Sequence, residues 1–163
     1  MDADVRFMKE ALKEARKAFL KDEVPVGCVI VKGGKVIARA HNQREGRQDA
    51  TAHAELLCIK KACKKLGSFR LNGCELYVTL EPCPMCAGAI INARVERAVF
   101  GAYDPKAGCC GTLYDLLGCG KFNHTLKAVG GVMEEECSDI LKRFFAEKRR
   151  AQRELNCLTK GDG

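Results

Sequence analysis

Two almost continuously apolar segments, CELYVTL (74–80) and ERAVFGA (96–102), constrain the fold of this chain more than any other feature. Such runs are typical of strands that are buried on both faces of a sheet. The segment between them, PMCAGAIINA (84–93), has the composition of a helix. A strand, a helix and a second strand in this order form a unit whose strands lie parallel. The chain is therefore predicted to have an α/β fold.

Further elements are predicted before this unit. Apolar residues recur every three or four positions in Val5–Phe19, which predicts a helix with one buried stripe. Residues 24–42 are predicted to form a hairpin, because Gly33-Gly34 between two β-branched arms supplies the positive φ of a two-residue turn. A second helix is predicted over Ala52–Leu66, with Gly67 suited to its left-handed cap.

A weak strand at Leu126–Val129 and a helix from about Glu136 to Leu155 complete the order, followed by a frayed tail at residues 159–163. Helices then alternate with strands around one mainly parallel sheet. Residues 1–163 contain no linker, repeat or low-complexity segment, which predicts a single domain. The N-terminal segment is charged and no apolar run approaches a membrane span, so we expect a cytoplasmic protein without a membrane partner.

Cysteine content and charge bear on the chemistry. Eleven cysteines cannot all pair with one another, and a reducing cytosol keeps thiols free, so metal ligands and small buried residues are the expected uses. The formal net charge of +7 favours an anionic partner such as nucleic acid, although many ordinary enzymes are equally basic.

The motif EPCPMC (81–86) directly follows the strand 74–80 and opens the next helix, with Pro84 suited to its first turn. Cys83 and Cys86 then share a face, and the partial positive charge at a helix N-terminus favours the thiolates that bind zinc. Taken alone, this spacing also fits half of a structural zinc site, a redox pair or chance in a cysteine-rich chain.

The segment TAHAE (51–55) supplies the other half of a site. Side chains in the first turn of a helix lean toward its N-terminus, so His53 and Glu55 can converge although they are two positions apart. If both helices point their N-termini at one pocket, His53, Cys83 and Cys86 supply three zinc ligands. The fourth position stays open for water, as in catalytic zinc sites, and Glu55 can act as proton shuttle.

The pair HAE…PCPMC resembles the signature of zinc-dependent cytidine deaminase-like enzymes. Further segments, EVPVGCVIV, DATAHAE, LYVTLEPCPMCAGAI and VFGAYDPKAG, resemble the bacterial tRNA-specific adenosine deaminase family over nearly the whole chain. The resemblance implies a three-layer α/β/α sandwich on a five-stranded mixed sheet, a homodimer and one zinc ion per subunit. It also implies that a zinc-activated water attacks C6 of the wobble adenosine in a tRNA anticodon, with Glu55 moving the protons.

Matching positions imply roles for further residues. Asn42 would hydrogen-bond the purine, and Asp104 would hold the ribose 2′-hydroxyl, a contact that can favour RNA over DNA. Backbone amides near Ala54 and Cys83 would orient the base and the water. Asn42 and Asp104 also suit ordinary turns, and His124, which matches a family segment near the anticodon loop, is expected to be structural.

The C-terminal helix carries LKRFFAEKRRAQREL (141–155), for which a solvated charged face is the default interpretation. In the family this helix helps to grip the anticodon loop. Matching positions give Phe145 as an aromatic contact and Lys148 and Arg149 as contacts to phosphates and bases. Ala146 stands where members often carry Arg, which shifts more of the contact to Lys148 and Arg149.

Two other functions stay open. A relative with the same fold can act on a free base or nucleoside such as guanine or cytosine, although this would not need the basic C-terminal helix. Alternatively, a zinc-stabilised RNA-binding protein would close its site with a fourth ligand such as Cys109. Packing is the expected role of Cys109 and Cys110, where the family usually has small residues. The apolar helix in PMCAGAIINARVER (84–97) is the candidate dimer surface.

Overall fold

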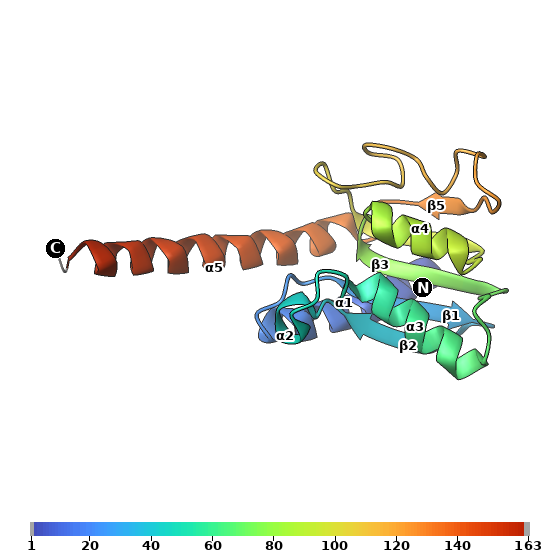
Figure 1. Cartoon of the computed structure of the whole chain (residues 1–163), viewed down its shortest axis with the longest axis horizontal. Helices are drawn as coiled ribbons and strands as arrows, with labels where there is room; N and C mark the ends of the chain where they lie inside the picture. Colours follow the sequence, from blue (N-terminus) through green and yellow to red (C-terminus); the bar gives the residue numbers. More distant parts are fainter. Residues whose placement is uncertain (1, 162–163) are drawn as a thin grey trace.

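The computed structural model describes residues 2–161, which form three layers around a five-stranded sheet (Figure 1). The strands lie in the order β2-β1-β3-β4-β5. Helices α1 and α5 pack on one face of the sheet, and α3 and α4 cover the other. The bounds are α1 Ala3–Leu20, β1 Gly27–Lys32, β2 Lys35–His41, α2 Arg44–Arg47, α3 Ala54–Leu66, β3 Cys74–Leu80, α4 Pro84–Asn92, β4 Arg97–Ala102, β5 Lys127–Val129 and α5 Glu134–Lys160. The predicted α/β/α sandwich on a five-stranded mixed sheet is confirmed.

Strand direction decides where the segments after the strands meet. β1 pairs antiparallel with both β2 and β3, whereas β3 with β4 and β4 with β5 are parallel. The expectation of a mainly parallel sheet is therefore wrong for the pairings of β1: the two-residue turn allows only antiparallel pairing of β1 with β2, and β1 is also antiparallel to β3. Four strands nevertheless run in one direction, with β1 alone opposed. Their carboxyl ends share one edge of the sheet, which is where α/β proteins bind ligands.

Several elements begin or end at residues other than those predicted. Gly33 and Gly34 have φ values of 57° and 75°, which confirms the hairpin turn. Helix α3 begins at Ala54 rather than Ala52, because His53 has an extended backbone and forms its N-cap. The four-residue α2 was not predicted.

The C-terminal helix also differs from its prediction. α5 begins two residues before the expected Glu136 and continues through Lys160, so the frayed tail is wrong for residues 159 and 160. Residues 162 and 163 of that predicted tail, and residue 1 of the predicted domain, lie outside the described residues.

Alternate strand residues form two apolar clusters, one on each face of the sheet. Val29, Val31 and Tyr77 pack with α1 and the start of α5. Ile30 and Val78 pack with α3 and α4. Within residues 2–161, no helix has the length and apolar character needed to cross a membrane.

Asp4 ties the start of α1 to the sheet. Its carboxylate accepts hydrogen bonds from Arg97 Nη2 at 2.6 Å and from Tyr77 Oη at 2.8 Å. The bond from Arg97 holds the pKa of Asp4 below its ordinary value of 3.8. Because folding lowers its pKa, the ionised carboxyl stabilises the fold at pH values above the pKa of the unfolded state. This stabilisation is lost as the pH falls through the pKa of the folded state.

Replacing this carboxylate tests the ion pair. Asp4→Asn is expected to lower the free energy of unfolding at pH 7 by about 1–2 kcal/mol, because Arg97 loses its charged acceptor. Urea denaturation as a function of pH should show the difference from wild type shrinking below about pH 4. Asp139→Asn, at an exposed position of α5, serves as control and should stay within about 0.5 kcal/mol. A difference that does not change with pH would contradict the assignment.

Candidate metal and substrate site

Helices α3 and α4 begin at the carboxyl edge of the sheet, after β2 and β3 respectively. His53 is the N-cap of α3 and Cys83 is the N-cap of α4. Both residues have extended backbones, and neither side chain caps its own helix. The side chains are therefore free to point at each other in front of two helix N-termini, whose partial positive charge favours bound anions and thiolates.

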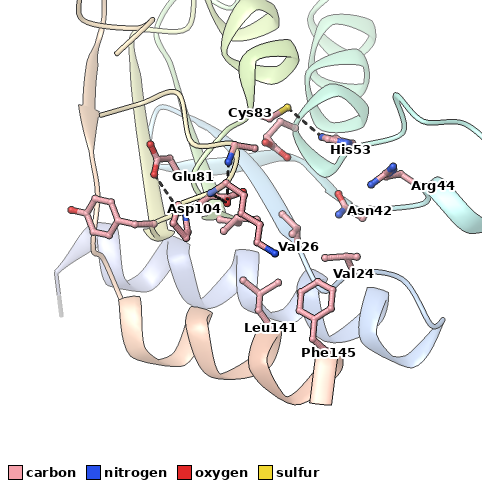
Figure 2. A pocket seen from close by; sticks show the side chains of 16 residues that line it. Val24, Val26, Asn42, Arg44, His53, Glu81, Cys83, Asp104, Leu141 and Phe145 are labelled. Carbon is pink, nitrogen blue, oxygen red and sulfur yellow. Dashed lines mark hydrogen bonds between the residues drawn. The ribbon is translucent and has the colours of Figure 1, made fainter. Parts of the chain in front are cut away.

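The three predicted ligands lie together. His53 Nδ1 is 3.6 Å from Cys83 Sγ and 3.4 Å from Cys86 Sγ, and all three ligand atoms lie within 4.8 Å of one another. Figure 2 shows Cys83 and His53 facing each other across the head of the pocket. A tetrahedral zinc with bonds of about 2.0–2.1 Å to nitrogen and about 2.3 Å to sulfur separates such atoms by roughly 3.6 Å. The spacing and the donor types therefore fit a zinc ion.

The ligand group stops at three. Among residues 2–161, no other His, Cys, Asp or Glu side chain belongs to this group. Cys109 is buried and its amide donates to the Pro82 carbonyl, but its thiol is not a member. The structure thus disfavours a closed site with Cys109 as fourth ligand, and Cys109 and Cys110 are packing residues of the α3–α4 cluster.

The pKa values of the two thiols are driven apart. The hydrogen bond from Cys86 lowers the pKa of Cys83 to about 4. The same interaction and burial raise the pKa of Cys86. The hydrogen bond to Cys83 raises the pKa of His53. The pair therefore holds one thiolate at neutral pH, which is the form that binds a cation.

Glu55 lies one residue inside α3 and its side chain faces the same cavity. It is only 4% exposed, and this burial raises its pKa to about 7. A carboxyl with a pKa near the working pH can accept a proton and return it at little cost, which general acid–base catalysis requires.

These groups open into a cavity of about 440 Å³. Its walls come from the segments that follow β2, β3 and β4, from the segment before β1 and from α5. In Figure 2, Asn42, Arg44 and His53 lie on one side, and Leu141 and Phe145 of α5 lie across from Cys83. The lining residues are Val24, Val26, Asn42, Arg44, His53, Glu55, Leu80, Glu81, Cys83, Tyr103, Asp104, Pro105, Lys106, Ala107, Leu141 and Phe145.

Asn42 and Ala54, which were both predicted to contact substrate, are hydrogen-bonded to each other. The Ala54 amide donates to Asn42 Oδ1 at 2.8 Å, and Asn42 is buried. Because a backbone N–H can only donate, this bond fixes which atom of the Asn42 amide points at α3. The Nδ2 donor of Asn42 is left for the cavity, while the Ala54 amide already has an acceptor.

Asp104 has the turn geometry that its neighbour Pro105 suggested. Its Oδ1 accepts from the amides of Lys106 and Ala107 at 2.9 and 3.2 Å, and the residue remains half-buried at the cavity wall. His124 is structural as expected, because its Nε2 lies 2.7 Å from the Val95 carbonyl oxygen.

Glu81 is a site residue that sequence reasoning missed. Its carboxylate accepts hydrogen bonds from the amides of Asp104, Cys110 and Thr112 at 3.0–3.1 Å, and from the Thr112 hydroxyl. The side chain is 2% exposed, and a Cβ at Gly108 would lie 2.4 Å from it. Glu81 therefore fixes the loop that carries Asp104 against the strand that leads to Cys83. Its position directly before the cysteine motif was the available signal.

On α5, Phe145 is 44% exposed and lines the cavity with Leu141. Lys148 forms an ion pair with Asp22, with Nζ 2.5 Å from Oδ1, and Arg149 is exposed. Two further basic residues at the cavity, Arg44 and Lys106, were not predicted.

Known proteins resemble this chain in sequence. The profile of the MafB19-like deaminase family matches residues 1–149. A tRNA-specific adenosine deaminase of Bacillus subtilis is 58% identical over 153 residues, which are 94% of this chain and 95% of that protein. The chain belongs to the tRNA-specific adenosine deaminase family.

Solved structures agree with this deaminase in fold. A structure from work on A-to-I editing by tRNA:A34 deaminases at the wobble position has a TM-score of 0.80 and 46% identity, over 83% of this chain and 99% of that one. A guanine deaminase of Bacillus subtilis has a TM-score of 0.59 and 37% identity, over 75% of this chain and 81% of that one.

A pair of buried cysteines tests the three-ligand assignment. Cys86→Ala is expected to abolish binding of one zinc equivalent by the deaminase, because the remaining two ligands cannot hold the ion tightly. Cys109→Ala removes the same group at a similar depth and should leave the zinc content unchanged. Elemental analysis after dialysis against excess zinc measures both. Loss of zinc in Cys109→Ala would instead support a closed site with Cys109 as its fourth ligand.

The anchoring role of Glu81 predicts a local effect. Glu81→Gln replaces an accepting oxygen with an NH₂ group that faces other donors, so the loop at residues 104–112 should detach. Amide hydrogen exchange at Cys110 and Thr112 should accelerate by about tenfold or more, with a loss of about 1–3 kcal/mol in unfolding free energy. Zinc content should not change. Glu147→Gln on the exposed side of α5 is the control, and protected amides in Glu81→Gln would refute the role.

Proposed function

We propose that this deaminase hydrolyses the wobble adenosine of a tRNA anticodon to inosine, with one zinc ion per subunit, in the cytoplasm. One observation carries the proposal. The ligand group of His53, Cys83 and Cys86 stops at three and faces the same cavity as the buried Glu55. A structural metal site would need neither the open side nor the carboxylate.

The chain's own residues account for the proton transfers. A zinc ion held by His53, Cys83 and Cys86 would supply activation of a water molecule as nucleophile. Glu55 accepts a proton from that water as its oxygen bonds to C6 of adenine. Glu55 delivers this proton to ring N1, then takes the proton of the new C6 hydroxyl and passes it to the amino group, so that the C6–N bond breaks, the C6 carbonyl forms and ammonia leaves. One water is consumed for each inosine formed, and Glu55 returns to its starting state.

Asn42 and Asp104 orient the nucleoside in this proposal. Asn42 Nδ2 donates to an acceptor nitrogen of the purine, and the Ala54 amide contributes by holding Asn42 rather than by contacting the base. Asp104 Oδ1 is occupied by the amides of its own turn. Its other carboxylate oxygen is the one we assign to the ribose 2′-hydroxyl, which RNA has and DNA lacks.

The cavity wall on α5 favours RNA over a free base. Phe145 offers an exposed ring on which a neighbouring base can stack, and Arg149 lies one turn further along the helix. Lys148 is already ion-paired with Asp22, so we assign it a weaker phosphate contact than that of Arg149. The guanine deaminase of similar fold makes hydrolysis of a free base the alternative, but a free base needs neither the ring nor the basic helix.

Replacing the carboxylate separates catalysis from binding. Glu55→Ala is expected to reduce inosine formation in an anticodon stem-loop by about 10²–10⁴-fold, because the proton shuttle is lost. Zinc content and affinity for the stem-loop should stay within about twofold of wild type. Mass spectrometry of digested RNA, elemental analysis and fluorescence anisotropy measure the three quantities. Retained turnover would refute the role of Glu55.

We further propose a homodimer that uses the α4 side of the molecule. Met85 and Ala89 of α4 stay partly exposed. The loop between β4 and β5 packs on the same apolar cluster as α4 and exposes Leu113, Tyr114 and Phe122. Burying these side chains together would stabilise association of two copies.

Sedimentation tests this surface. At micromolar concentration the protein should sediment at about twice its chain mass of 17.9 kDa. Tyr114→Glu places a charge on the proposed surface and should shift the protein toward monomer. Phe69→Glu, equally exposed on the loop after α3, should leave the dimer intact. A wild-type monomer would contradict the proposal.

A further inference from the structure

After Phe144, helix α5 contacts the rest of the domain only through exposed side chains such as Phe145, which lines the cavity, and Lys148, which pairs with Asp22. Phe144 is its last buried residue, and every residue from Phe145 to Lys160 is exposed. This segment projects into solvent as a straight arm (Figure 1), over roughly 22 Å at 1.5 Å per residue. The matched family profile ends at residue 149, so most of the arm lies beyond it. The family profile therefore assigns no role to most of the arm.

One face of the arm continues the cavity wall. At about 100° per residue, Gln152, Arg153, Asn156 and Lys160 all lie within roughly 60° of Arg149, and so does Phe145, which lines the cavity. We call Gln152, Arg153, Asn156 and Lys160 the distal stripe.

The other sides of the arm differ from this face. Its two carboxylates, Glu147 and Glu154, lie roughly 140° or more from Arg149. Leu155 and Leu158 lie at roughly 120° or more. The distal stripe thus carries hydrogen-bond donors and positive charge, without a carboxylate on the same side.

The composition of the stripe points to one kind of partner. Arginine, lysine, glutamine and asparagine contact phosphates and sugars in nucleic-acid complexes, and duplex RNA is recognised mainly through its phosphates and 2′-hydroxyls. Single strands are instead held by aromatic side chains, and residues 146–160 contain none. The distal stripe rises roughly 12 Å from Gln152 to Lys160, and A-form RNA rises less per nucleotide than the roughly 3.4 Å of B-DNA, so the stripe spans about four or more phosphates of one strand.

We propose that the distal stripe binds the backbone of the duplex stem that adjoins the loop entering the cavity. This inference rests on the proposed function, because it takes the loop nucleotide in the cavity as its starting point. The stem then lies along the stripe, Arg153 and Lys160 contact phosphates, and Gln152 and Asn156 contact phosphate or 2′-hydroxyl oxygens. Gln152 Nε2 already donates to Asn156 Oδ1 at 3.0 Å, which aligns these two side chains.

Varying the length of the stem tests whether the distal stripe binds it. Two hairpins with the same adenosine-containing loop carry a stem of about three or about eight G·C-rich base pairs. Their affinities for zinc-loaded protein are measured by fluorescence anisotropy as a function of salt, with inosine formation measured in parallel. Arg153→Gln/Lys160→Gln is compared with Lys64→Gln/Lys65→Gln, which removes the same charge from the far end of α3.

The wild-type protein and the α3 variant should bind the long stem at least about tenfold more tightly than the short one. Arg153→Gln/Lys160→Gln should bind both stems alike, and its salt slope for the long stem should fall by about two. Inosine formation in the short hairpin at saturation should not change.

Equal binding of both stems by wild type would overturn the inference, as would equal weakening of both by the stripe variant. A change in sedimentation of that variant would also overturn it, because the stripe would then be an assembly surface. Failure of the proposed function looks different, since no inosine would form in either hairpin with wild-type protein.

Discussion

The common direction of β2, β3, β4 and β5 is the constraint on which the site depends. These strands end at one edge of the sheet, so the segments that leave them must start there. β2 is followed by His53 at the start of α3, β3 by Cys83 at the start of α4, and β4 by the Asp104 turn. Two helix N-termini consequently face one point, where their dipoles favour the thiolate that in turn binds a cation. Reversing any one of these strands would remove its contribution.

Buried polar side chains keep this edge rigid. The Glu81 carboxylate replaces the water that the amides of the 104–112 loop would otherwise bind, and Asn42 satisfies the first amide of α3. Within the part of the chain that the structure describes, every fully buried side-chain nitrogen and oxygen has a hydrogen-bond partner. Burial of an unpaired polar group would cost several kcal/mol, so these pairings restrict the loops to few conformations. The reacting groups are therefore positioned before a substrate enters.

Sequence reasoning reached the ligands because their spacing reflects local geometry. His53, Cys83 and Cys86 follow from two helix starts, and the open fourth position followed from the ligand types. Glu81 and the pairing of Asn42 with Ala54 depend on contacts between segments far apart in the chain, which no local pattern records. The direction of β1 relative to β3 was missed for the same reason, because apolar runs reveal burial but not pairing. The sequence did not predict that α5 continues to Lys160, because its last turns are exposed and carry no periodic pattern of buried residues.

The molecule combines a small reactive site with a long basic arm, and an RNA substrate explains both at once. The site is thereby assigned to adenosine held in an RNA loop. The direct measurement is to incubate zinc-loaded protein with an anticodon stem-loop carrying a wobble adenosine, and separately with free adenosine, guanine and cytidine, and to identify products by mass spectrometry. We expect inosine in the stem-loop and no turnover of the free compounds. Deamination of guanine with an unchanged stem-loop would contradict this assignment.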